Sequence, residues 1–251
     1  MEVHHHSHPA GSDNHRNKKK WTHYFWEFLM LFLAVFCGFL AEYQLEHKIE
    51  RDREKQFIAS FIEDLKTDTA AIRQNLHFRK QKMERMDSLL QLLSNRQIKG
   101  HENELYYFGR TLIRNAWFQS NDRTIIQLKN SGSLRLIRNE EVADSIISYQ
   151  KLVDIIQVNQ DDERNERVST IPVLSRLFNP FEFDKMMSIG GITRPTNNPA
   201  LRSYDENLQQ DLALYIHFIK GSTYIIEERL QLLHNRATNI LLFLKRKYHL
   251  K

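Results

Sequence analysis

Apolar side chains recur at alternating steps of four and three residues through a long stretch of the chain. The positions are Ile58, Ile62, Leu65, Thr69, Ile72, Leu76, Arg79, Met83, Met86, Leu90 and Leu93. Only Thr69 and Arg79 interrupt the apolar series. This 3.5-residue period is typical of the seam along which a helix packs in a bundle or a coiled coil. No proline or glycine occurs between Ala41 and Ile98, so the pattern predicts one long helix that ends between Asn95 and Gly100.

Four further helices are predicted after this one. The first covers 105–118, and its expected buried side consists of Leu105, Phe108, Leu112, Ile113 and Trp117. The second covers 124–131 and stops at Gly132, which suits the left-handed position after a helix end. The third starts after the N-cap Asn139, bends near Pro172 and ends by Asn179. The last runs from 204–205 to about residue 247.

The segments between these helices are expected to be irregular or exposed. Residues 133–138 are predicted to cross without helical structure, with Leu134, Leu136 and Ile137 filling the bundle core. The polar stretch 160–167 inside the third of these helices is expected to face solvent. Residues 188–203, which contain the pair Gly190-Gly191, are predicted to form one long loop.

An apolar block precedes the helical body. From Tyr24 to Ala41 the only charged residue is Glu27, and about 18 such residues are near the lower limit for crossing a bilayer core. A signal peptide is the competing interpretation. However, neither a cut after Ala41 nor a cut before Cys37 has the small residue expected three positions before the cleaved bond. We therefore expect an uncleaved anchor.

The charges beside this block indicate its orientation. A purely basic cluster lies before it, whereas the residues after it mix both signs; the cluster consists of Arg16, Lys18, Lys19 and Lys20. The positive-inside rule then places the N-terminus in the cytoplasm and the body outside the inner membrane. The predicted domains are a cytoplasmic tail (1–20), a transmembrane anchor (21–43) and an extracytoplasmic helical bundle (44–251). The predicted fold class is all-α.

Composition narrows the functional classes. The 251 residues are 41% hydrophobic, which is sufficient for one core, and the 8 glycines and 5 prolines argue against a many-stranded sheet. The net charge of +5 is concentrated before the apolar block and in the last seven residues. A membrane surface explains both clusters, so no nucleic-acid partner is expected. The single cysteine, Cys37, excludes an intrachain disulfide.

The N-terminal tail contains a group of histidines. His4, His5, His6 and His8 lie so close together that their imidazoles could chelate a divalent metal ion. A solvated tail with incidental affinity for metals is the favoured alternative. The body has no Glu-x-x-His pair, no zinc-protease motif and no phosphate-binding Gly-Lys-Ser/Thr motif, so neither an enzyme nor a cofactor is expected.

Two features point towards association. Glu27, Ala34, Gly38 and Ala41 fall on one face of the anchor helix, and Ala34 and Gly38 form a small-x-x-x-small pair that permits close helix packing in lipid. Glu27 could pair with a group on another helix or reach the headgroups. At the C-terminus, residues 241–244 could either finish the core or bring the basic end to the membrane.

One segment is similar to a known group of proteins. In "IIQLKNSGSLRLIRNEEVADSIISYQKL", a leucine-bearing helix is followed by Ser-Gly, Leu-x-Leu-Ile-x-Asn and a second helix with a tyrosine. The matching residues are Leu128, Ser131, Gly132, Leu134, Leu136, Ile137, Asn139 and Tyr149. This resembles an uncharacterised family of small, single-pass, membrane-anchored helical proteins of Bacteroidota. The resemblance implies an anchor, an all-α body and a Gram-negative inner membrane, and it carries no activity.

The expected function is therefore that of a membrane-anchored structural or protein-interaction module. Its expected partners are the membrane and either further copies of itself or another membrane protein. The alternative is an extracytoplasmic sensor or transport accessory that binds a small ligand beside Gly190-Gly191.

Overall fold

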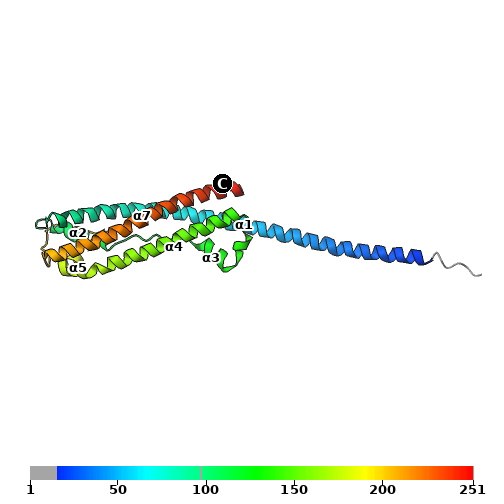
Figure 1. Cartoon of the computed structure of the whole chain (residues 1–251), viewed down its shortest axis with the longest axis horizontal. Coiled ribbons are helices and arrows are strands. Elements are labelled where there is room, and N and C mark those ends of the chain that lie inside the picture. Colours follow the sequence, from blue (N-terminus) through cyan, green and yellow to red (C-terminus); the bar gives the residue numbers. More distant parts are fainter. Residues whose placement is uncertain (1–15, 97, 251) are drawn as a thin grey trace, which may run out of the picture. The chain divides into compact units, whose positions relative to one another are not determined.

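The computed structural model describes residues 16–96 and 98–250, with side chains from residue 21 onwards (Figure 1). The long helices are α1 (Arg16–Ser94), α4 (Glu140–Ser169) and α7 (Glu206–Tyr248). The shorter ones are α2 (Glu102–Leu112), α3 (Arg123–Asn130), the 3-10 turn η1 (Ser133–Leu136), α5 (Ile171–Leu177) and α6 (Pro180–Lys185). The strands β1 (Met187–Ser188) and β2 (Gly191–Ile192) form a small antiparallel hairpin. The all-α prediction is confirmed.

The chain divides into two compact units, Met1–Glu54 and Lys55–Lys251. In the described part of the first unit, α1 contains a stretch that is long and apolar enough to span a membrane, and none of that stretch is buried. Apolar side chains exposed on every side of a helix are costly in water and favourable in lipid. By its length and composition this stretch is therefore a candidate membrane span, and a signal sequence near the N-terminus would have the same properties.

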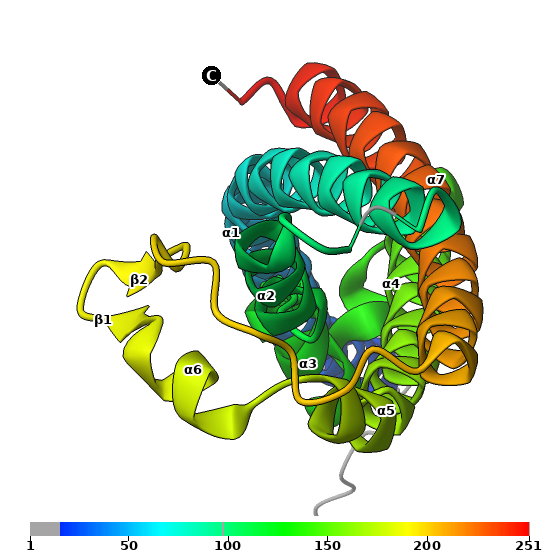
Figure 2. The same ribbon diagram turned by 90° about the vertical axis from the view of Figure 1, so that its left-hand side faces the viewer.

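The second unit is a bundle of four columns (Figures 1 and 2). Three columns are α1 from Lys55 onwards, α4 continued by α5, and α7. The fourth column consists of α2, an extended segment at 113–122, and α3. Helix α6 and the β hairpin lie beside α2, outside the columns (Figure 2).

Two apolar clusters fill the bundle, one towards each end. One cluster lies at the end of the bundle that contains Lys55. It joins α1, α4 and the second half of α7, for example through Ile58, Val142 and Leu244. The other cluster joins the end of α1, α2, α5 and the start of α7, for example through Met86, Leu174 and Leu212. The 4/3 spacing seen in α1 continues in α7, where Leu212, Ile216, Ile219, Thr223, Ile226, Leu230, Leu233, Ala237, Ile240 and Leu244 are all buried.

The turn between α3 and α4 is formed by a glycine and an asparagine. Gly132 follows the C-cap residue Ser131 with a φ of 64°, in the left-handed region that a side chain with a Cβ disfavours. Asn139 precedes α4, and its Oδ1 accepts a hydrogen bond of 3.1 Å from the backbone N–H of Val142. The chain between them forms the 3-10 turn η1, where a segment without helical structure was predicted.

The helix predicted at 105–118 was wrong in its extent. Helix α2 ends at Leu112, six residues before the predicted end, and Trp117 is 47% exposed where a buried side chain was expected. Side chains on distant helices bind the backbone of 113–122 and replace its helical hydrogen bonds. These partners cannot be recognised in the local sequence.

Two predictions left alternatives open that the structure distinguishes. The seam at 58–93, expected in a bundle or a coiled coil, packs into the core of its own bundle. At the C-terminus Leu244 is buried and Leu241 and Phe243 pack against the same core, whereas Leu242 is exposed. The structure therefore favours the interpretation in which most of these residues finish the core.

Candidate functional site

A layer of buried polar side chains separates the two apolar clusters. It is formed by Asn75, Arg79 and Lys82 of α1, Gln160, Glu163 and Arg167 of α4, and Thr223 of α7. The prediction that 160–167 faces solvent holds for Asp161, Asp162, Arg164 and Asn165, which are exposed. It was wrong for the other side of the helix, where Glu163 is 0% exposed. Gln160, Glu163 and Arg167 continue the 4/3 spacing of Val153 and Ile156, and this spacing points them into the bundle.

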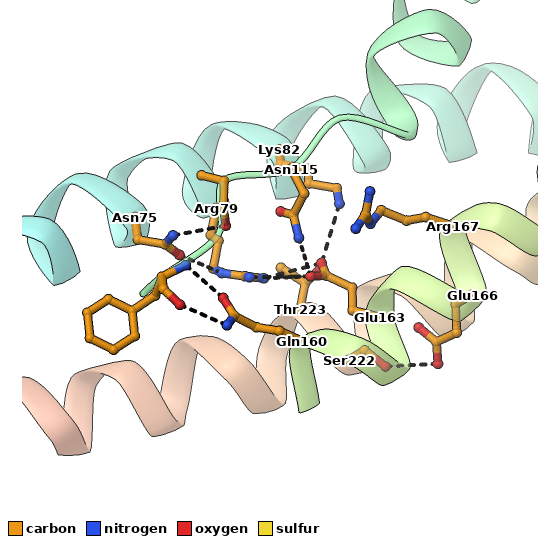
Figure 3. Close-up of polar contacts among 12 residues, drawn as sticks. Asn75, Arg79, Lys82, Asn115, Gln160, Glu163, Glu166, Arg167, Ser222 and Thr223 are labelled. Carbon is orange, nitrogen blue, oxygen red and sulfur yellow. Dashed lines mark hydrogen bonds and ion pairs between the residues drawn. The ribbon is translucent and has the colours of Figure 1, made fainter. Parts of the chain in front are cut away.

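Glu163 is the centre of this layer (Figure 3). Its carboxylate accepts three hydrogen bonds of 3.2–3.3 Å from the guanidinium of Arg79. It also accepts bonds from Lys82 Nζ at 3.3 Å, from Thr223 Oγ1 at 2.8 Å and from the amide of Asn115. Three columns of the bundle and the extended segment thus meet at one carboxylate.

The buried charges in the layer balance each other in part. Burial alone would raise the pKa of Glu163, but Lys82 and Arg79, with hydrogen bonds from Thr223 and Asn115, hold this pKa below its ordinary value. Burial lowers the pKa of Lys82 to about 8, against the opposing attraction of Glu163 and with the repulsion of Arg167 and Arg79. Burial also lowers the pKa of Arg79, and the charge and hydrogen bonds of Glu163 offset part of this lowering. An arginine remains protonated despite such a shift.

The same layer holds the extended segment 113–122. Gln160 accepts a bond of 2.8 Å from the backbone N–H of Phe118 and donates one of 3.0 Å to the carbonyl of the same residue. Asn75 donates to the carbonyl of Ala116 at 2.9 Å, and Arg167 donates to the carbonyl of Ile113 at 2.7 Å. A buried backbone without secondary structure requires such partners, since an unpaired N–H or C=O group is costly.

Two buried aspartates of α1 hold the far end of this segment. Asp68 accepts bonds from Ser120 Oγ and Tyr149 Oη, both at 2.6 Å, and from the N–H of Asn121 at 2.7 Å. Asp64 accepts from the N–H of Thr124 at 3.0 Å, at the start of α3. Burial, together with the neighbouring Asp68, raises the pKa of Tyr149, so this phenol remains a donor in the physiological range.

The geometry of the layer suits a structural role, in which its side chains hold the extended segment 113–122 in place, better than acid–base chemistry. The Glu163 carboxylate is surrounded by donors, and the cavity beside Lys82 has a volume of only about 10 Å³, which is roughly the minimum for one water molecule. That cavity, which Lys82 lines but Glu163 does not, has no room for a substrate. In the part of the chain that the structure describes, no cluster of three His, Cys, Asp or Glu residues could hold a metal ion.

The residues singled out in the sequence lie apart from this layer. His4, His5, His6 and His8 lie outside the described residues. Glu27, Ala34, Gly38 and Ala41 are exposed on the apolar part of α1, where Glu27 lies 3.6 Å from His23 one turn earlier. Gly190-Gly191 lies at the exposed β hairpin. The polar layer itself was missed, although the unbroken 4/3 spacing through Gln160, Glu163 and Arg167 was a usable signal.

Comparisons of the chain with protein-family models, with curated proteins and with solved structures find no match.

Proposed function

We propose that this is a single-pass membrane protein that presents a rigid helical bundle as an interaction module. The observation that carries the proposal is the contrast between the two units. The apolar stretch of α1 in the first unit has no buried residue, whereas the second unit encloses its own apolar core. Lipid is the environment that would cover the first without disturbing the second.

The proposed location is the inner membrane of a Gram-negative cell, with the bundle on the periplasmic side. The one-sign basic cluster before the apolar stretch supports this orientation. The test uses a reporter that is active only in the periplasm. Fused after Lys251 it should be active, and fused at Ser12 it should be inactive. The reverse pattern would place the bundle in the cytoplasm.

We further propose that the anchor pairs with a second copy of itself. Ala34, Gly38 and Ala41 form an exposed small-residue face, and a Cβ added at Gly38 meets no atom within 4 Å, which leaves space for a close neighbouring helix. Cysteine crosslinking in membranes, with Cys37 first changed to serine, should peak at positions 34, 38 and 41. Gly38→Leu should abolish the peak. Uniform crosslinking around the helix would contradict this pairing.

An enzymatic role is not part of this proposal. The support is the crowded geometry around Glu163, where every carboxylate oxygen is occupied by donors from the protein. The polar layer instead holds the extended segment 113–122 in place and gives the bundle a fixed shape, which is what a protein-interaction module requires.

A further inference from the structure

A pocket of about 380 Å³ lies between α2, α5 and α6, away from the polar layer. Its wall is mainly apolar and includes Ile171, Leu174, Phe178 and Phe183. Gly109 of α2 also lines it, and a Cβ at this position would lie 2.8 Å from the ring of Phe178. The glycine thus allows the Phe178 ring to pack directly against the α2 backbone. The volume falls within the range of small-molecule sites.

Two arginines also line this pocket, Arg110 and Arg202. Arg110 donates a bond of 3.2 Å to the sulfur of Met187, and its guanidinium lies 6.0 Å from the centre of the Phe183 ring. Arg202 donates through Nη1 to the carbonyl of Ser175 at 2.9 Å. Within residues 21–96 and 98–250, neither guanidinium pairs with a carboxylate.

Other arginines of the bundle do pair with a carboxylate. Arg79 is paired with Glu163, and Arg194 lies 3.1 Å from Glu104. At Arg110 and Arg202 the acceptors are a thioether, a ring face and one carbonyl, so most of their N–H groups remain available. A guanidinium next to an apolar wall is well suited to a carboxylate, which can accept two parallel hydrogen bonds.

We propose that this pocket binds a small carboxylate that carries an apolar or aromatic group. Its carboxylate is held by Arg110 and Arg202, and its apolar part packs on Leu174, Phe178 and Phe183. This site is separate from the loop at Gly190-Gly191, which does not line the pocket. The bundle would then bind a small ligand in addition to its role as an interaction module. This ligand site does not depend on which side of the membrane the bundle occupies.

The test uses the full-length chain in lipid nanodiscs and three probes of nearly equal shape. These are 3-phenylpropionate, 3-phenylpropanol and 3-phenylpropylamine, and their binding is measured by ligand-observed NMR against empty nanodiscs. The carboxylate should bind at least about tenfold more tightly than the alcohol, because charged hydrogen bonds are lost with the alcohol. The amine should not bind at all.

Matched variants locate the site. Arg110→Gln and Arg202→Gln should each weaken binding of the carboxylate by about tenfold, whereas Arg176→Gln, on the exposed side of α5 and outside the pocket, should leave it unchanged. Ser175→Phe places a ring at the pocket wall from an exposed position and should block binding. Circular dichroism and the melting temperature verify that each variant is folded.

Three results would overturn the proposal. One is equal affinity for the three probes, which would indicate apolar partitioning alone. Another is binding that survives both Arg202→Gln and Ser175→Phe in folded protein. The third is the absence of carboxylate binding at millimolar concentration.

Discussion

Glu163 is a single side chain on which the centre of the bundle depends. It is completely buried, and it is the carboxylate that Arg79 and Lys82 contact. A buried ion pair is not a large net source of stability, but the loss of one partner leaves the others as uncompensated buried charges. Conservative changes at this position should therefore be costly.

Glu163→Gln is expected to lower the free energy of unfolding of the bundle by about 3 kcal/mol, because Arg79 and Lys82 lose their counter-ion. Urea denaturation followed by circular dichroism measures this change. The matched control is Asp162→Asn, one residue earlier and exposed, which should change the free energy by no more than about 0.5 kcal/mol. Equal effects of the two substitutions would show that the buried pairing does not matter.

Lys82 should make the stability of the bundle depend on pH. Its pKa is about 8 in the folded protein against 10.5 in the unfolded chain. Between these values the unfolded chain binds more protons, so the contribution of Lys82 to the free energy of unfolding rises with pH. This contribution is complete above pH 10.5 and is lost as the pH falls through 8. The groups that surround Lys82 are Glu163, Arg167 and Arg79.

Lys82→Met removes this titration. Between pH 7.5 and 10, the free energy of unfolding of the natural protein should rise relative to that of the variant by an amount on the order of 2 kcal/mol. Denaturation curves recorded at several pH values measure the difference. Lys80→Met, at an exposed position on the same helix, should produce no such trend. A constant difference between the natural protein and Lys82→Met would mean that the Lys82 pKa is not lowered by burial.

At the scale of the elements, the turn after α3 depends on backbone conformation alone. A Cβ added at Gly132 meets no atom within 4 Å, yet its φ of 64° is unfavourable for other residues. Gly132→Ala should therefore lower the free energy of unfolding by about 1 kcal/mol. Gly221 is the control, because it lies inside α7 with the same open space for a Cβ. Gly221→Ala should instead stabilise the bundle by about 0.5–1 kcal/mol, and the same sign for both would contradict the assignment.

The sequence predicted elements well where the information is local. The 4/3 spacing located α1 and its end, and the start predicted at 204–205 lies next to the start of α7 at Glu206. The bend predicted near Pro172 corresponds to the break between α4 and α5. The prediction from sequence failed at 113–122, because the apolar positions Ile113 and Trp117 fit a helix that the structure does not form. The extended conformation depends on Asp68 and Gln160, which are far away in sequence.

The candidate site could be predicted less well than the fold. A polar residue in an apolar series, such as Arg79, indicates a buried charge only when its partner is known. That partner, Glu163, is 84 residues away, and the polar stretch around it resembles an exposed helix face by composition. The spacing of Gln160, Glu163 and Arg167 could have indicated burial, whereas the pocket with Arg110 and Arg202 arises only from the packing of α2, α5 and α6.

At the scale of the whole molecule, the second unit should fold without the first. The second unit, Lys55–Lys251, contains both apolar clusters and the polar layer. A protein that consists of 55–251 is therefore expected to be soluble without detergent and to unfold in one cooperative transition, as measured by circular dichroism during heating. Its melting temperature should lie within a few degrees of that of the full chain in nanodiscs. An insoluble or partly unfolded product would show that residues 1–54 contribute to the core.

The polar layer also fixes how the helices align along their length. The apolar spacing of α1, α4 and α7 repeats every seven residues, so a helix that slipped by one repeat would still bury apolar side chains against apolar side chains. The slip would, however, bring Glu163 next to Ile72 or Met86 instead of Arg79, and an unpaired charge would then lie in an apolar cluster. We therefore expect a triple variant with Arg79→Met, Lys82→Leu and Glu163→Met to remain helical and yet to populate several alignments. Methyl NMR spectra would show more than one signal per methyl group, whereas a single set would mean that packing alone determines the alignment.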